Sequence, residues 1–154
     1  MVRDPDGELI EETIDWYAQD LDGNVWYFGE ISKSYEDGEL DNLDGSWKSD
    51  KDEAKPGIIM EAAPEEGDFY REEYFLGDAE DVAEVIDTDV DGVGVPLGVY
   101  NDVLNTKNSS PIEPDVYELK YHALGIGTIL EVGYDVDDMP TGERVELVST
   151  TNIP

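Results

Sequence analysis

Residues 13–31, TIDWYAQDLDGNVWYFGEI, decide the fold because they read as one β-hairpin. Asp22 and Gly23 have the residue types that a two-residue type I′ turn needs, since both of its central positions require a positive φ. Antiparallel alternation outward from that turn predicts these opposite pairs: Asp20–Val25, Gln19–Trp26, Ala18–Tyr27, Tyr17–Phe28, Trp16–Gly29, Asp15–Glu30 and Ile14–Ile31. We expect the core on the face that carries these apolar side chains: Ile14, Trp16, Tyr27 and Ile31.

Turn signals recur about every 8–12 residues along the rest of the chain, and no stretch has a confident helical period. A second tight turn is predicted at Asp37-Gly38, and residues 69–76 are predicted to form one continuous strand. Pro96 predicts an edge or irregular strand at residues 93–100, and two prolines predict a loop at residues 108–115. We expect a final strand near the C-terminus.

These patterns predict an all-β fold, an antiparallel meander of roughly eight to ten strands that forms a curved sheet, a half-barrel, an open barrel or a sandwich. The length of 154 residues suits one domain, residues 1–154, with its own core. Residues 1–7 are expected to form a shortened N-terminal strand and turn, and residues 149–154 a frayed tail.

The chain carries 40 Asp and Glu residues against nine Lys and Arg residues, a formal net charge of −31. Nucleic acid binding is excluded as a function class, because a phosphate backbone needs a basic surface, and anionic membranes are disfavoured for the same reason. The acids are spread over every segment, so we favour a salt-adapted, halophilic-type protein surrounded by counter-cations over a single purpose-built cation site.

The chain has no cysteine, which excludes disulfides, thiolate metal sites and cysteine nucleophiles. It has no run of 18 apolar residues and no apolar segment near Met1. We therefore expect neither a membrane span nor a signal peptide within it. This is compatible with a cytoplasmic protein, or with an exported one whose leader has been removed.

Four stretches together resemble a family of uncharacterised all-β domains found in predicted exported or lipid-anchored proteins of bacteria and haloarchaea. They are TIDWYAQDLDGNVWYFGE (13–30), GSWKSDKDEAKPGIIM (45–60), DFYREEYFLGDAEDVAEV (68–85) and ELKYHALGIGTILEV (118–132). The resemblance covers residues 8–132 and implies a strongly curved antiparallel sheet and a place outside the cell or in the cell envelope. Relatives have more strands before residue 8, which implies that an edge they cover is open here. No catalytic residues come with the resemblance.

Asp87, Asp89, Asp91 and Gly92 have the spacing that opens a calcium-binding loop, in which alternate oxygens face one cation and glycine permits the turn. The twelfth position is Gly98 instead of glutamate, and no flanking helices are predicted, so this is not an EF-hand. We consider Asp87, Asp89 and Asp91 as ligands of weakly bound calcium and expect no other cofactor. Chance strings of this kind are also expected in so acidic a chain.

Two other groups of polar residues are open to a chemical interpretation. Asp15 and Glu30 are predicted to lie opposite each other, where like charges repel and one pKa can rise; a salt-adapted surface produces the same pairing without a function. The only histidine, His122, is expected at a half-exposed position beside Glu118 and Lys120. No nucleophile elbow accompanies it, and we expect no enzymatic activity.

The sequence is most consistent with a non-catalytic binding or structural module. Its ligand face is predicted to carry aromatic rings, namely Trp16, Tyr27, Tyr70 and Tyr74, although most of these rings are also candidates for the core. One alternative is a divalent-cation (calcium) binding protein that uses its acidic loops. Another is an assembly subunit that associates with itself or with a protein partner through an open edge strand.

Overall fold

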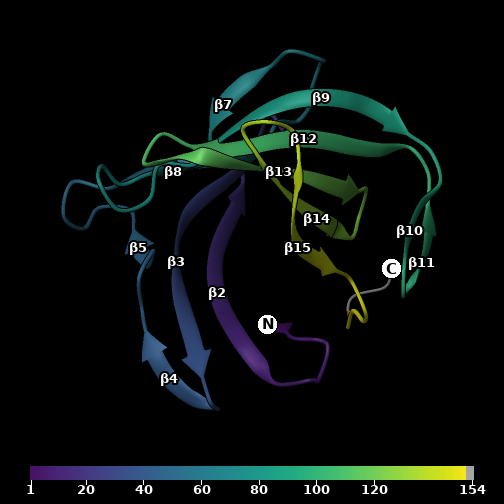
Figure 1. Ribbon diagram of the computed structural model, residues 1–154. Helices are drawn as coiled ribbons and strands as arrows, with labels where there is room; N and C mark the ends of the chain where they lie inside the picture. Colours follow the sequence, from purple (N-terminus) through teal and green to yellow (C-terminus); the bar gives the residue numbers. More distant parts are fainter. Residues whose placement is uncertain (152–154) are drawn as a thin grey trace. The chain divides into compact units, whose positions relative to one another are not determined.

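The computed structural model describes residues 1–151, which form strands and loops without any helix (Figure 1). The tail predicted at residues 149–154 therefore lies partly outside the described residues. Every pairing between strands is antiparallel, which confirms the predicted fold class. The chain divides into two compact units, residues 1–63 with 71–81 and residues 64–70 with 82–154. That the whole chain is one domain stays a prediction.

The first unit contains one sheet, in which the order of the long path is β1-β2-β3-β6-β8, and β4 and β5 also pair with β3. Its strands are β1 (Val2–Arg3), β2 (Leu9–Gln19), β3 (Val25–Glu36), β4 (Glu39–Asn42), β5 (Trp47–Lys48), β6 (Lys55–Met60) and β8 (Glu73–Tyr74). Its buried core comprises Tyr27, Trp47, Ala54 and Ala79, with Ile59 and Phe75 packed against them.

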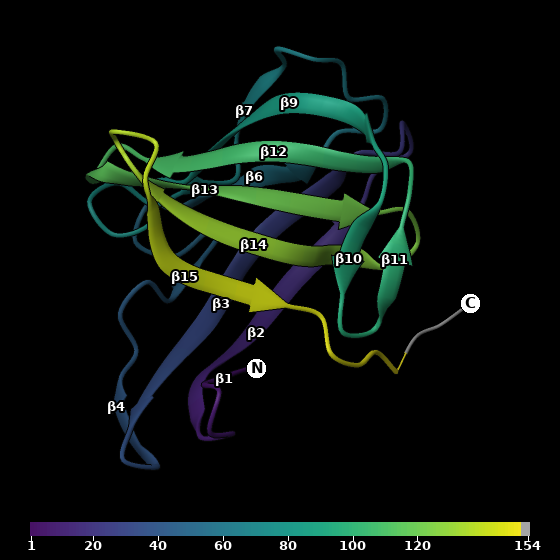
Figure 2. The ribbon, with the colours of Figure 1, turned by 45° about the vertical axis from the view of Figure 1, so that its right-hand side comes forward.

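The second unit is built on a sheet of order β15-β14-β13-β12-β9-β7, and Figure 2 shows β12 to β15 side by side. These strands are β7 (Phe69–Arg71), β9 (Val82–Val90), β12 (Val103–Ser110), β13 (Glu113–Ala123), β14 (Gly127–Asp135) and β15 (Pro140–Glu146). β10 (Val93–Val95) and β11 (Gly98–Tyr100) form a separate hairpin. The buried core comprises Val93, Val103, Ala123, Ile129 and Leu130.

The loop of the opening hairpin is longer than the predicted two-residue turn. β2 pairs with β3 only as far as Gln19 opposite Val25, which leaves residues 20–24 in the loop. One oxygen of the Asp20 carboxylate accepts hydrogen bonds from the amides of Asp22, Gly23 and Asn24, and the other accepts from the Asn24 side chain and from the Trp26 indole at 2.8 Å. These bonds lower the pKa of Asp20 to about 2. A type I′ turn at Asp22-Gly23 would forgo them. Of the two predicted turns, Asp37-Gly38 is the one that has a positive φ at both central positions, 51° and 77°.

The register of this hairpin shifts by one residue at a β-bulge, and this changes which side chains share a face. Ile14 lies opposite Ile31 as predicted, but Tyr17 lies opposite Tyr27, so two residues of β3 face Trp16 alone. Tyr27 consequently joins the face of Asp15, whose carboxylate accepts a 2.8 Å hydrogen bond from its hydroxyl. The predicted core face is wrong: Tyr27 is 5% exposed on the opposite face, whereas Ile14 is 45% exposed.

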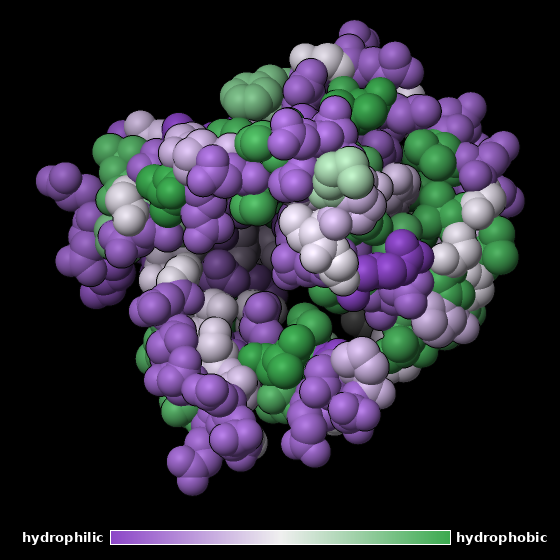
Figure 3. Space-filling view, viewed as in Figure 1, coloured by the Kyte–Doolittle hydropathy of each residue, from purple (hydrophilic) through white to green (hydrophobic). Residues whose placement is uncertain are grey.

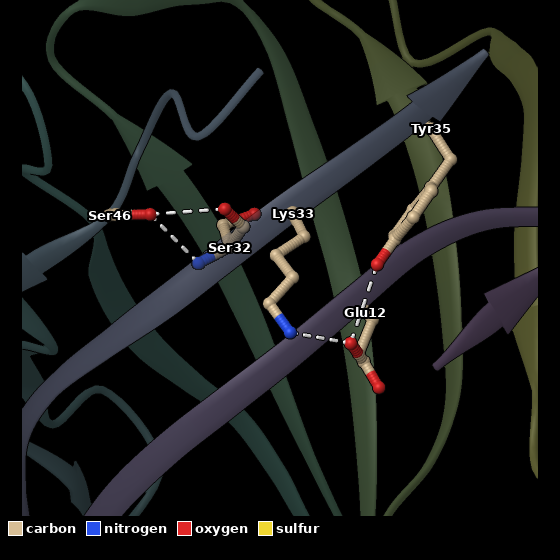
Figure 4. A network of polar contacts seen from close by, with 5 residues as sticks. All are labelled: Glu12, Ser32, Lys33, Tyr35 and Ser46. Atoms are coloured by element: carbon tan, nitrogen blue, oxygen red, sulfur yellow. Dashed lines mark hydrogen bonds and ion pairs between the residues drawn. The ribbon is translucent and has the colours of Figure 1, made fainter. Parts of the chain in front are cut away.

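Polar contacts hold the far end of this hairpin together (Figure 4). Glu12 lies directly opposite Lys33, and the lysine ammonium donates to its carboxylate at 2.7 Å, which lowers the pKa of Glu12. The Tyr35 hydroxyl approaches the same oxygen at 3.5 Å. Ser46 accepts from the Ser32 amide and donates to the Ser32 carbonyl, so the segment that leads into β5 is fastened to β3.

The single strand predicted at residues 69–76 is wrong, because the chain turns at Glu72. The amides of Glu72 and Glu73 both donate to the Asp81 carbonyl, at 2.8 and 3.1 Å. Successive amides of an extended strand point in opposite directions, so one acceptor can serve both only where the chain bends. As a result β7 joins the sheet of the second unit and β8 joins that of the first.

Two further segments differ from the prediction in the second unit. Residues 93–100 form the β10–β11 hairpin and not one irregular strand, with Val95 opposite Gly98. Residues 108–115 are not a loop, since β12 runs to Ser110 and β13 starts at Glu113. In both places a proline lies in the tight turn itself, where its fixed φ is favourable and its missing amide is not needed.

Two glycines provide a matched test of the bulge, Gly29 within β3 and Gly38 in the turn that follows β3. Gly29 has φ of 134°, and a Cβ there would overlap the Trp47 carbonyl and lie 2.7 Å from the Lys48 Cα. Gly38 has a positive φ but no atom near its Cβ position. We expect Gly38→Ala to lower the free energy of unfolding by about 1 kcal/mol and Gly29→Ala by roughly 3 kcal/mol or more, because it adds steric overlap to strain.

Urea unfolding at constant salt, followed by tryptophan fluorescence, measures both values. An equal decrease in the free energy of unfolding for the two variants would contradict the close approach of β5 to the bulge.

Candidate functional site in the first unit

A pocket of about 320 Å³ lies in the first unit, beside the bulge of β3. Its lining comes from β2, β3, β5, the loop after β5, and the segment after β8: Trp16, Glu30, Ile31, Ser46, Trp47, Lys48, Lys51, Asp52, Ala54 and Phe75. We call this the aromatic pocket, because three of these side chains are Trp16, Trp47 and Phe75. Its volume falls in the range of small-molecule sites, which combine mostly apolar walls with a few polar groups.

The bulge places the walls of the aromatic pocket. β5 pairs with β3 through Gly29 opposite Lys48 and Glu30 opposite Trp47. The ammonium of Lys48 lies 4.7 Å from the centre of the Trp16 ring, a cation–π contact across the pocket. The ring of Trp47 packs edge-on against Tyr27 at 5.3 Å, and Tyr27 stacks on Tyr17 at 4.8 Å.

Half-buried acidic groups adjoin the pocket on the side of Trp47. The Glu30 and Glu73 side chains hydrogen-bond to each other, and the Trp47 indole donates to Glu73 at 3.2 Å. Burial raises the pKa of Glu73 to about 8, with Asp81 and Glu30 as further causes. The pKa of Glu30 is also raised, chiefly by burial and less by Asp15. The predicted Asp15–Glu30 pairing and the raised pKa are confirmed, although burial outweighs repulsion.

The four aromatic residues of the predicted ligand face do not gather in one place. Trp16 lines the aromatic pocket, while Tyr27 is buried behind it. Tyr74 lines a second cavity of about 580 Å³ that shares Ala54 and Phe75 with the first, and its ring is contacted by Lys55 and Arg71. Tyr70 is buried in the second unit. Sequence reasoning missed Trp47, Glu73 and Phe75, because strand pairings far apart in the chain bring them together.

The predicted cation ligands are brought together only in part. Asp89, Asp91 and Asp102 each offer a carboxylate oxygen, and these oxygens lie within 4.8 Å of one another. Asp87 is outside this cluster and accepts a hydrogen bond from the Asp89 amide. The proximity of Asp102 raises the pKa of Asp89. Asp102 belongs to the cluster because β9 and β12 pair at Val90 and Val103. This pairing brings the link before the β10–β11 hairpin, which contains Asp91, next to the link after it, which contains Asp102.

Hydrophilic residues cover much of the face shown in Figure 3, and hydrophobic residues lie between them in small groups. The structure contains no helix among residues 1–151 that is long and apolar enough to cross a membrane. Most of the outer edge of β2 is unpaired within the described chain, since β1 reaches only Leu9 and Glu11. Assembly through this edge stays a prediction.

No protein family matches the chain, and no curated protein or solved structure is similar to it. The resemblance to the uncharacterised exported domains therefore stays a prediction, and the site has to be interpreted from its own geometry.

His122 is buried, contrary to the expectation of a half-exposed position. It is 9% exposed, and its ring nitrogens lie 3.2 Å from the Thr106 hydroxyl and 3.1 Å from the Thr128 hydroxyl. Burial lowers its pKa to about 4, with a smaller contribution from Lys120. A neutral histidine between two hydroxyl groups is part of the buried interior of the second unit.

We expect the NMR titration of the His122 ring to show a pKa near 4 instead of the ordinary histidine pKa of 6.5. A histidine whose pKa is lowered by folding stabilises the fold fully above pH 6.5, and this contribution is lost as the pH falls toward 4. A midpoint near 6.5 in the folded protein would contradict the burial of this ring.

Proposed function

We propose that the protein is a non-catalytic binding module of a salt-adapted, acidic type, and that a small ligand occupies the aromatic pocket. The observation that carries this proposal is the charge of the pocket's lysines. In a chain with 40 acidic residues, Lys48 and Lys51 line the aromatic pocket without an ion pair to any described carboxylate. Lys55 and Lys107 also have no ion pair among the described residues, but each lies over a tyrosine ring, whereas Lys48 and Lys51 are brought together in one pocket.

The ligand that best fits these groups has a flat apolar body and an anionic group. The rings of Trp16 and Trp47 provide apolar surface for the body. The two lysine ammonium groups provide donors for a carboxylate, sulfonate or phosphate, and Ser46 adds a hydroxyl. Two acids line the pocket, Glu30 and Asp52. Glu30 receives a hydrogen bond from Glu73, which reduces its repulsion of an anion, and Asp52 lies next to Lys51 in the loop after β5. The resemblance supports a place outside the cell or in the cell envelope.

A pair of dyes that share an apolar body tests the proposal directly. We expect anilinonaphthalene sulfonate to bind more tightly than the uncharged N-phenylnaphthylamine, and the double variant Lys48→Gln/Lys51→Gln to weaken the sulfonate dye about tenfold, the effect of losing a charge-assisted contact. The uncharged dye should be affected little. Dye fluorescence in molar KCl, at a pH near 6, measures both affinities.

The control is Lys107→Gln in the second unit, where the ammonium also lies over an aromatic ring, that of Tyr117, at 3.7 Å. This variant removes a positive charge that lies over an aromatic ring, as Lys48→Gln does, without touching the aromatic pocket. Equal weakening by both substitutions, or equal affinity of both dyes for the unaltered protein, would contradict an anion-binding pocket.

A second candidate function is divalent-cation binding, favoured by the convergence of Asp89, Asp91 and Asp102 from two separate segments. Three carboxylate oxygens within a few ångströms of one another suit the oxygen-rich coordination of calcium. Their exposure and small number are typical of weak, roughly millimolar binding.

For this candidate we expect calcium at about ten times its dissociation constant to raise the melting temperature by about 3–6 °C over KCl of the same ionic strength. Asp102→Asn should abolish this difference, whereas Asp137→Asn, in another acidic loop, should leave it unchanged. Calorimetric melts of the three proteins measure the shift. A shift no larger than that of matched KCl would contradict the calcium site.

A further inference from the structure

The carboxyl pair Glu30–Glu73 joins strands that are not neighbours in the first sheet. Glu30 is on β3 and Glu73 on β8, and β6 lies between these strands in the sheet order. Two ionised carboxylates have only acceptors, so their hydrogen bond requires that one of them keeps a proton. Trp47 donates its indole hydrogen to Glu73 and thereby fixes the position of that carboxyl group.

The segment that carries Glu73 has a short backbone pairing with the sheet. β8 pairs with β6 only at Lys55–Tyr74 and Pro56–Glu73, and the proline has no amide to donate. The amides of Phe75 and Ala79 bond within the segment itself, as do those of Glu72 and Glu73 to Asp81. Apart from the core contacts of Ala79 and Phe75, the segment is therefore held mainly by the ring contacts at Tyr74 and by the carboxyl pair.

We propose that the carboxyl pair is a proton-operated latch, which holds residues 71–81 on the sheet while the pair shares a proton and releases them when the proton is lost. The step is a simple ionisation, in which the Glu73 carboxyl gives its proton to solvent and the pair becomes two carboxylates. Two like charges in contact at a site lined by indole and phenol rings repel each other and are poorly solvated. The movable partner is residues 71–81, because β8 has only two pairings with its neighbouring strand in the sheet.

The charged groups around the pair favour release after ionisation. On the side of β2 and β3, the pair is faced by Glu11, Asp15 and the Tyr27 hydroxyl, and beside β8 by Asp81. The positive groups of the neighbouring elements have other contacts: Lys48 with Trp16, Lys55 with Tyr74, and Arg71 with Tyr74 and Glu80. Lys51 and Asp52, in the loop after β5, line the pocket beside Glu30. The groups that act most strongly on the pair are thus acidic.

The pH range of the latch follows from the sign of the shift. Folding raises the pKa of Glu73 from 4.5 to about 8. A carboxyl group with a raised pKa in the folded state contributes stability that is complete below pH 4.5 and is lost as the pH rises through 8. The latch is therefore closed at neutral pH and opens in mildly alkaline solution.

Hydrogen exchange of the full chain in molar KCl tests the latch without any ligand, so its outcome is independent of the proposed function. After correction for the intrinsic exchange rate at each pH, we expect the protection factors of peptides from residues 71–81 to fall at least tenfold between pH 6 and pH 9. Peptides from Val103–Ser110, in the second unit, serve as the internal reference. Unchanged protection of residues 71–81 over this range would overturn the proposal.

The variant Glu73→Gln separates the latch from general alkaline loosening. Glutamine can donate a hydrogen bond to Glu30 and does not titrate, so its segment should keep the same protection at pH 6 and pH 9. In the control variant Glu84→Gln, which changes an exposed position of β9, residues 71–81 should lose protection at pH 9 as they do in the unaltered protein. Loss of protection in Glu73→Gln at pH 9 would overturn the proposal.

A measurement on the unaltered protein covers the case in which Glu73→Gln fails to fold. The carbon NMR signal of the Glu73 carboxyl group should titrate near pH 8, and a midpoint near 4.5 would overturn the proposal.

Discussion

The structure of the first unit depends on the one-residue bulge at which Trp16 faces both Phe28 and Gly29. A shift of one residue moves every side chain beyond it to the other face of a strand. The shift brings Tyr27 to the face of Asp15, where its ring is buried and its hydroxyl is bonded. Gly29 has no side chain, so β5 can approach β3 closely and place Trp47 against Tyr27. The aromatic pocket and the carboxyl pair are both consequences of this register.

The pocket contrasts with the chain's charge distribution. Most acidic side chains are exposed, where salt screens their repulsion, yet Glu30 and Glu73 are half-buried in the first unit. Of the nine Lys and Arg residues, three line the pocket and its neighbouring cavity, namely Lys48, Lys51 and Lys55, and Arg71 contacts the Tyr74 ring beside them. A salt-adapted surface alone explains dispersed acids, but it does not explain half-buried carboxyl groups beside gathered lysines. That combination indicates a site shaped by contacts other than solvation.

The sequence was sufficient for local structure and insufficient wherever a side chain competed with the backbone or a distant strand intervened. Alternation predicted Ile14 opposite Ile31, and Asp37-Gly38 formed the expected turn. The Asp22-Gly23 turn failed because the Asp20 carboxylate binds three loop amides, a competition that residue preferences do not express. Within the candidate site, the Asp15–Glu30 pairing was predicted from antiparallel alternation along the hairpin. Glu73 could not be predicted, because the bend at Glu72 depends on Asp81, nine residues further along the chain.

The two proposals meet at Glu30 and Phe75, because Glu30 belongs to both the carboxyl pair and the pocket, and Phe75 lies in the latched segment and lines the pocket. An anion held by Lys48 and Lys51 would lie beside Glu30 and make ionisation of the pair less favourable. The ligand would therefore raise the pH at which residues 71–81 are released. Linkage is reciprocal, so the shared proton would strengthen ligand binding by the same free energy. A pocket whose wall opens when a proton leaves would then retain its ligand at neutral pH and release it in alkaline solution.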